Sequence, residues 1–376
     1  MNEETPAIGN TAWNAIFKSI SNGKTILFLG PSIATNQNGI SLQREFFENL
    51  YKEKKVTNEI ISYNARDEFF VFNKPDEIAL RSAISDFFMK DFAESIYSLI
   101  AEIPFHLIIL VSPDMTLKRM FEKKFYSHNY NYFDYNKPRK IDTPPTKECP
   151  LIYNLFGMAE DHHTLILTHN NMFSYLENYY RQTVNNRALL NEIQQQFDTP
   201  GFADNLLFIG MDFNKWYMQW IIHELKINVA DFQRFALDCS SSVVNKTLIE
   251  KQYSITFVNN NIEDFFNKIL QYFKDENAKD PAKYKLRQPK QSDNKVYNTN
   301  NIVELLEKYF NDGEISKICM IHFDEVYSDF GSGMIKSKKI EMLVDYAEKH
   351  LSFDDLLKYC EEMNPKAYEL FKPYWK

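Results

Sequence analysis

The chain has 376 residues, of which 44% are hydrophobic and 25% are charged, so it is long enough for two or three ordinary globular domains. Its formal net charge of −8 gives no overall attraction to nucleic acid, and we expect no nucleic-acid partner. No apolar run approaches the roughly 20 residues needed to cross a bilayer, and the first residues lack the pattern of a signal peptide. We therefore expect a cytoplasmic protein with no membrane partner.

The four cysteines, Cys149, Cys239, Cys319 and Cys360, lie far apart in the sequence. They form no Cys-x-x-Cys pair, which argues against a zinc site of the usual spacing and against a disulfide framework. We expect reduced thiols and no bound metal.

Short apolar runs alternate with longer amphipathic stretches from about residue 11 to residue 273. The apolar runs predict strands at Thr25–Leu29, His106–Val111, Leu151–Leu155, Thr164–Leu167, Leu206–Ile209, Arg234–Leu237 and Ser254–Val258. The amphipathic stretches predict helices over Leu42–Lys52, Ile78–Phe88, Phe92–Ala101, Met172–Gln182 and Lys215–Leu225. Strands separated by helices favour an α/β fold with a Rossmann-like, doubly wound and mainly parallel sheet. The aperiodic segment Tyr126–Pro150 is predicted as a long excursion.

The composition changes near Lys274, where Lys, Asp, Gln and Pro replace the apolar residues. We predict a first domain over residues 1–273, a polar linker over residues 274–299 and a second domain over residues 300–376. Apolar residues recur at helical spacing in the last segment, over Ile302–Phe310, Ile315–Ile321, Lys338–Lys349 and Phe353–Met363. This pattern predicts a small bundle of four to six helices without a cluster of catalytic residue types.

The first strand prediction ends at the turn Gly30-Pro31-Ser32. A strand followed by a glycine turn and a helix presents backbone N–H groups to an anion, which is how nucleotide phosphates are commonly held. No Gly-Lys-Ser/Thr follows at the required spacing, so the turn is not a Walker loop.

Further segments follow this turn in a recognisable order: His106–Asp114, Ile152–Gly157, Leu165–Thr168, Leu206–Phe213 and Ile255–Phe265. With the first turn, they resemble in order the motifs of sirtuin-like domains. These motifs are the Gly-Ala-Gly-x-Ser turn, the Thr-Thr-Asn-Tyr-Asp motif, the strand ending in His-Gly, the Val-Leu-Thr segment, the Phe-Ile-Gly-x-Ser loop and the closing strand and helix. The resemblance covers about residues 11–273.

The resemblance implies a sheet that binds NAD in the crevice at the carboxyl ends of its strands. It places these residues at the cofactor: Gly30, Ser32, Phe156, Gly157, Gly210, Asp212 and Asn259. The family's activities are NAD-dependent deacylation and, in bacterial defence proteins, hydrolysis of NAD to nicotinamide and ADP-ribose. Deacylases usually carry a four-cysteine zinc module, and this chain lacks those cysteines, so hydrolysis is the favoured branch.

The sequence departs from the family at the positions that carry the chemistry. The family's general-base histidine corresponds to Phe156, and its asparagine falls in Ser112-Pro113-Asp114, at Pro113. Pro31 replaces a residue of the first turn and removes one N–H group from it. Both central polar groups of the usual reaction are therefore missing.

Replacement groups are available nearby. Asp114, at a strand end, would stabilise an oxocarbenium-like state, or it would instead cap the helix that begins near Met115. His162, or the neighbouring His163 or His169, would act as a base, or would be a surface or capping residue. Asp212 in turn would hydrogen-bond a ribose hydroxyl or cap the next helix.

The helical pattern after residue 300 resembles the effector-associated, death-domain-like modules of bacterial conflict systems. Those modules join an effector to a partner by pairing with a similar module. The resemblance implies a partner protein that carries such a module, and assembly of this chain into a homo-oligomer or filament. The alternative is a domain that only packs on the first and stabilises it.

Two functions remain open at this point. The first is a sirtuin-like effector of antiphage defence that binds NAD and hydrolyses its nicotinamide–ribose bond. The second is a catalytically inactive scaffold or adaptor that binds NAD, ADP-ribose or no nucleotide. Phe156 favours the second function, and the order of the motifs favours the first.

Overall fold

The computed structural model describes residues 8–124, 126–137, 144–184, 205–224, 233–237, 239, 241–289, 297–331, 333–349 and 352–374. The chain divides into two compact units, Met1–Arg287 and Gln288–Lys376. Each unit has its own apolar core.

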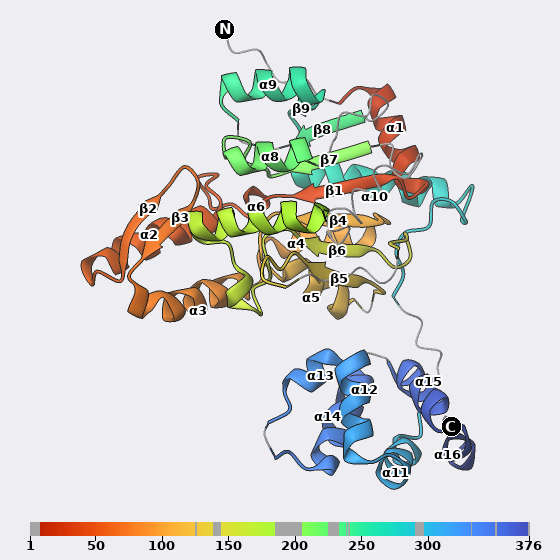
Figure 1. Ribbon diagram of the computed structural model, residues 1–376. Helices are drawn as coiled ribbons and strands as arrows, with labels where there is room; N and C mark the ends of the chain where they lie inside the picture. The colour runs from red at the N-terminus through yellow and green to blue at the C-terminus, as the bar shows by residue number, and fades with distance from the viewer. Residues whose placement is uncertain are drawn as a thin grey trace. The chain divides into compact units, whose positions relative to one another are not determined.

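A seven-stranded parallel sheet forms the centre of the first unit (Figure 1). Its strands are β1 (Thr25–Leu29), β4 (Leu107–Leu110), β5 (Asn129–Tyr132), β6 (Leu151–Asn154), β7 (Asn205–Ile209), β8 (Gln233–Leu237) and β9 (Thr256–Val258). They lie in the order β5-β6-β4-β1-β7-β8-β9. All five residues of β1 are buried, as expected for a central strand covered on both faces. The Rossmann-like α/β prediction is confirmed.

Helices cover both faces of the sheet. One face carries α1 (Asn10–Ser21), α4 (Glu94–Glu102), α5 (Thr116–Lys123) and α10 (Ile262–Asn277). The other face carries α6 (His169–Val184), α8 (Trp216–Glu224) and α9 (Val243–Tyr253), of which α6 and α8 lie in front of the sheet in Figure 1. Successive side chains of a strand point to opposite faces, so Phe28 packs under α6 and α8 while Leu27 and Leu29 pack under the first set.

Residues 42–88 form an insertion between β1 and β4. The insertion consists of α2 (Leu42–Val56), the antiparallel hairpin β2 (Ile60–Asn64) and β3 (Phe69–Phe72), and α3 (Glu77–Phe88). It extends beyond one end of the sheet in Figure 1. Aromatic rings dominate its core, with Phe46 and Phe87 stacked at 4.1 Å and Phe47 edge-on to Phe70 at 5.1 Å.

Several elements of the first unit differ from the sequence prediction, among them one predicted strand and one edge strand that was not predicted. The prediction of a strand at Thr164–Leu167 is wrong, because its first residue ends a 3-10 helix, η3 (His162–Thr164), and the following residues are not in the sheet. Its apolar side chains, Leu165 and Leu167, instead pack into the core of the insertion. The excursion Tyr126–Pro150 supplies the edge strand β5, whose alternation of Asn and Tyr carries no strong apolar signal.

Arg287 is the last residue of the first unit. Residues 278–287 fall in the predicted linker, yet Tyr284 and Leu286 pack against the sheet-domain core and Arg287 is buried. The guanidinium donates to the carbonyls that precede β4, those of residues 101, 103 and 105, at 2.9–3.0 Å. Burial lowers the pKa of Arg287 to about 10, so the group remains charged at neutral pH.

The elements named in the described residues of the second unit are all helices. Its helices are α11 (Thr299–Tyr309), α12 (Asp312–His322), α13 (Asp324–Ser328), α14 (Lys336–Lys349), α15 (Phe353–Met363) and α16 (Pro365–Leu370). A core that includes Leu305, Leu343 and Leu356 holds them together, as the helical spacing predicts. Among the helices that the structure describes, none is long and apolar enough to cross a bilayer.

Candidate functional site

Four neighbouring strands, β6, β4, β1 and β7, end at the same edge of the sheet and carry the predicted site segments. Gly30 follows β1, Asp114 follows β4, Phe156 follows β6 and Gly210 follows β7. The carboxyl ends of adjacent parallel strands are the usual ligand site of open α/β sheets. Asn259 is exposed after β9, three strands away from β1, and so lies apart from the others.

Backbone hydrogen bonds join the turns that follow β1 and β7. The N–H of Gly30 donates to the carbonyl of Ile209 at 2.8 Å, and that of Ser32 donates to the carbonyl of Gly210 at 3.0 Å. The N–H of Ile33 donates back to Gly30 at 3.2 Å, and Pro31 has no N–H. The N–H groups of residues 30–33 are therefore satisfied by the protein, and this turn does not fit a pyrophosphate as a backbone cradle.

A small cavity of about 40 Å³ lies at this edge, between the sheet and the insertion. Its walls are mostly apolar, with Gln43, Glu68, Lys215 and Tyr217 as polar members. A second cavity, of about 20 Å³, is lined by Ser112, Asp114 and Tyr97. Both cavities share the walls formed by residues 31, 43 and 88. Ligand pockets usually measure about 300–1,000 Å³, so neither cavity is large enough for a dinucleotide in this conformation.

A buried ion pair joins the insertion to the sheet across the larger cavity. The Nζ of Lys215 lies 2.9 Å from Oε2 of Glu68, and the two side chains are 2% and 6% exposed. Burial alone would lower the pKa of Lys215, but the adjacent carboxylate of Glu68 opposes this effect, and the pKa of Lys215 is raised. Lys215 is therefore charged at neutral pH, and Glu68 is its partner.

Neighbouring polar groups hold Glu68 in place. The Nε2 of Gln43 donates to Oε2 of Glu68 at 2.7 Å, and the hydroxyl of Tyr217 donates to the carbonyl of Asp67 at 3.1 Å. The Oε1 of Gln43 and Oδ1 of Asp67 are buried without a hydrogen-bond partner among the described residues. A buried acceptor without a donor is costly, and a ligand N–H or O–H group would satisfy the one on Gln43, which lines the cavity.

Phe156, which the sequence resemblance places at the position of a histidine, lies in an aromatic cluster. Its ring is edge-on to Tyr175 at 5.7 Å and to Tyr217 at 5.6 Å, and it lines the larger cavity. Burial raises the pKa of both tyrosines. Neither the ring of Phe156 nor these neutral phenols can act as a strong base at neutral pH.

Asp114 lines the smaller cavity and is buried. Its carboxylate accepts from the N–H of Thr116 at 3.2 Å and from the hydroxyl of Tyr97 at 3.3 Å. Burial raises the pKa of Asp114, and these hydrogen bonds only partly oppose that effect. Thr116 is the first residue of α5, so the side chain of Asp114 satisfies one backbone N–H group at the start of this helix, as the capping alternative predicts.

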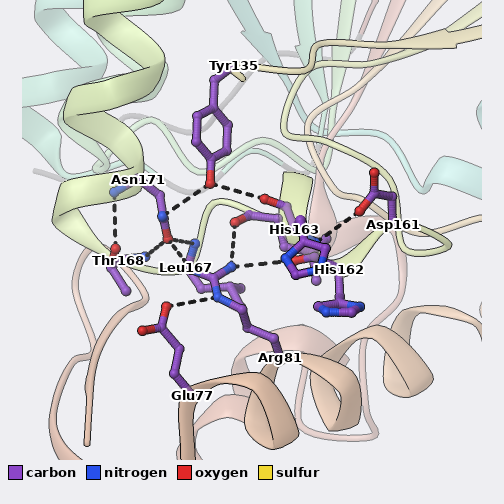
Figure 2. Close-up of polar contacts among 10 residues, drawn as sticks. Glu77, Arg81, Tyr135, Asp161, His162, His163, Leu167, Thr168 and Asn171 are labelled. Carbon is purple, nitrogen blue, oxygen red and sulfur yellow. Dashed lines mark hydrogen bonds and ion pairs between the residues drawn. The ribbon is translucent and has the colours of Figure 1, made fainter. Parts of the chain in front are cut away.

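His162 lies in a separate polar network (Figure 2). Arg81, from α3, donates to the carbonyl of Leu165 at 3.0 Å and to the side chain of Asn171 at 2.8 Å, and pairs with Glu77. Figure 2 shows these bonds fixing the loop that carries His162 and His163 against the insertion. Neither histidine is among the described residues that line the two cavities.

Asp212 has a local structural partner. Its Oδ1 accepts from the backbone N–H and from the side-chain amide of Asn214, both at 3.1 Å. The turn that results leads through Lys215 into α8.

Comparison with known families agrees with this arrangement. The SIR2-like domain family matches residues 114–258, and effector-associated domain 7 matches residues 302–365. The chain carries a SIR2-like domain followed by an effector-associated domain. Its SIR2-like match includes the segments at Asp114, Phe156 and Gly210, whereas the Gly30 turn precedes it. No curated protein sequence matched the chain.

The SIR2-like domain has polar residues at its cavity that the sequence analysis missed. Gln43 and Glu68 belong to the insertion, and Lys215 was assigned only as the start of a helix. Each is an ordinary surface residue type, and only the fold buries them together. The side chains that face the cavity fit a polar ligand, although the turn amides do not. Within the described residues, no group of three His, Cys, Asp or Glu side chains can hold a metal.

Proposed function

We propose that this protein is a SIR2-like effector component of bacterial antiphage defence that binds NAD or ADP-ribose as a ligand and does not cleave it. The SIR2-like domain receives the nucleotide at the carboxyl edge of the sheet. The effector-associated domain pairs with a similar module, on a partner protein or on another copy of this chain. Nucleotide binding then acts on assembly and not on NAD chemistry.

Phe156 is the main reason for proposing that the protein does not cleave NAD. The family's reaction needs a base beside the nicotinamide ribose. The sequence resemblance assigns Phe156 to that position, and its ring is edge-on to two tyrosines and cannot accept a proton. Pro113 lines the same cavity and cannot replace the amide of an asparagine. Side chains that still face the cavity are suited to hold a ligand: Lys215 carries a positive charge, and Gln43 has a free acceptor.

The second unit supports a role in association. Its described charged side chains lie almost entirely at the surface, while Met320 and Ile321 of α12 are 52% and 53% exposed. Adjacent exposed apolar side chains on a helix are a common feature of protein interfaces.

Nicotinamide release tests the proposal directly. The full-length protein is incubated with NAD, alone and after assembly has been induced by high protein concentration. Released nicotinamide is measured by chromatography, and ADP-ribose binding is measured by calorimetry. We expect binding without release. Nicotinamide produced above the uncatalysed background would contradict the proposal.

NAD hydrolysis is the second candidate function, and Asp114 is the observation that favours it. A buried carboxyl group at the end of β4 is suited to stabilise a positive charge that develops on a ribose. If the wild-type protein releases nicotinamide, Asp114→Asn should reduce the rate by about 100-fold or more while the fold is retained. An unchanged rate in this variant would assign the reaction to another group.

A further inference from the structure

The diphosphate of a nucleotide needs compensating positive charge, and the Gly30 turn does not provide it. The N–H groups of Gly30, Ser32 and Ile33 all donate to backbone carbonyls. The 3-10 helix that follows, η1 (Pro31–Ile33), has three residues and offers no helix terminus of useful length. An anionic ligand at this edge therefore depends on a side chain.

Lys215 is the one cation among the described residues that line the two cavities. It is 1% exposed and directly precedes α8, whose amino end adds positive potential at the same place. Its present partner is Glu68, at 2.9 Å. The cation that an anionic ligand would need is thus already neutralised by a carboxylate of the same chain.

We propose that Lys215 is the residue that binds the diphosphate of the nucleotide, and that Glu68 is its internal competitor. This inference rests on the nucleotide binding proposed above. The ligand class is a nucleoside diphosphate, such as the ADP-ribose moiety. The diphosphate takes the place of the Glu68 carboxylate beside Lys215, and the insertion moves away with Glu68.

The arrangement of the two side chains suits such an exchange. Glu68 lies in the turn between β2 and β3, while Lys215 belongs to the loop between β7 and α8. Separation of the pair therefore breaks no strand pairing of the main sheet. Glu68 adopts a left-handed backbone conformation with φ of 59°, which is uncommon for a residue other than glycine. Gln43, on α2 of the insertion, donates to Glu68 at 2.7 Å, so the carboxylate has a second partner within the insertion itself.

Opposite effects on affinity follow for the two partners. Glu68→Gln removes the competing charge and should tighten ADP-ribose binding by about tenfold, because the ligand no longer displaces a carboxylate. Lys215→Met removes the cation and should weaken binding by about tenfold or more. A structural role alone would make both variants bind more weakly. Glu48→Gln, on the partly exposed pair with Arg44, is the matched control.

Calorimetry on the full-length protein compares three probes: ADP-ribose, adenosine as its uncharged counterpart, and inorganic pyrophosphate as the bare anion. Thermal unfolding checks that each variant is folded. The double variant, with Lys215→Met and Glu68→Gln, removes both charges and keeps the test valid if the single change at Lys215 prevents folding. It should bind ADP-ribose more weakly than Glu68→Gln by about tenfold.

The outcomes separate this inference from the proposed function. Wild-type binding that is unchanged in the Lys215 variants, or binding weakened by Glu68→Gln, overturns the inference and leaves nucleotide binding standing. Absence of ADP-ribose binding in the wild type and in Glu68→Gln overturns both. Tighter binding in Glu68→Gln together with nicotinamide release supports the inference and contradicts the proposed absence of cleavage.

Discussion

The two units of this protein treat polar groups in opposite ways. In the SIR2-like unit, charged side chains are buried at several places, among them Glu68, Arg81, Asp114 and Lys215. In the effector-associated unit, Lys339 is the one charged side chain that is buried among the described residues, and its partner Asp312 is exposed. Buried charges are retained only where partners satisfy them.

This difference fits the two functions proposed for the units, ligand binding by the first and protein association by the second. The first unit buries charged side chains at the cavity, where they can select a small polar ligand, and also at the loop in Figure 2. The second unit has an ordinary apolar core and exposes apolar residues on α12, which are available for contact with another protein. Variants that affect one unit should therefore leave the other unchanged.

Arg287→Ala should have the largest effect on stability. It removes a buried guanidinium and leaves at least three backbone carbonyls without their donors, for a loss of about 4 kcal/mol in the first unit. Hydrogen exchange measured by mass spectrometry should become faster in residues 8–287 and remain unchanged in residues 297–374. Arg66→Ala, at an exposed position, is the control.

Leu306→Ala should destabilise the second unit by about 3 kcal/mol, because it leaves a cavity at a fully buried position of α11. The same hydrogen-exchange measurement should now show faster exchange only beyond residue 297. Ile335→Ala, at a position that is 68% exposed, should change little. Faster exchange in the SIR2-like unit would show that the units depend on each other for stability.

His106 makes the stability of the first unit depend on pH. Burial lowers the pKa of His106 to about 4, below its unfolded value of about 6.5, so the unfolded state binds a proton that the folded state does not. Its contribution to stability is present above pH 6.5 and is lost as the pH falls toward 4. At pH 5 the loss should be about 2 kcal/mol.

Thermal unfolding between pH 5 and pH 8 measures this effect. The quantity compared is the difference in the free energy of unfolding between the wild type and His106→Gln. Carboxylates titrate in the same range but contribute equally to both proteins, so they cancel in the difference. His163→Gln, at an exposed histidine, should retain the wild-type slope. A difference that does not vary with pH would contradict the prediction.

Ile321→Asp should have the smallest effect, on association alone. A charge at this exposed position of α12 should weaken self-association or partner binding by about tenfold, which equals about 1.4 kcal/mol, and leave the free energy of unfolding unchanged. Sedimentation velocity over a range of concentrations measures it. Val56→Asp, at an exposed position of the first unit, is the control.

The fold was largely predictable because its signals are local. β1, β4 and β7 are short, continuous apolar runs, and a fully buried parallel strand needs such a run. The run at Thr164–Leu167 has the same appearance, yet it packs into the insertion. A short apolar run reports burial and not the partner against which it is buried.

The candidate site was less predictable because its polar members come from distant segments. Asp114 and Phe156 were found from their places after strands, whereas Glu68 and Lys215 are 147 positions apart in the printed sequence and have no motif in common. Nothing in the sequence distinguishes Lys215 from the other lysines. Its burial follows from the path of the insertion over the sheet edge, which depends on long-range packing.

The contact between Gly30 and Gly210 has a consequence for comparing related chains. A methyl group added at Gly30 would lie 2.2 Å from the carbonyl oxygen of Gly210, and one added at Gly210 would lie 2.6 Å from the backbone nitrogen of Ile33. Gly210 also has a φ of +66°. Selection would therefore preserve both glycines in a descendant that no longer binds any nucleotide. Finding both glycines in a related chain would therefore show only that its two turns pack closely. A lysine at position 215 would be better evidence that the related chain still binds the ligand.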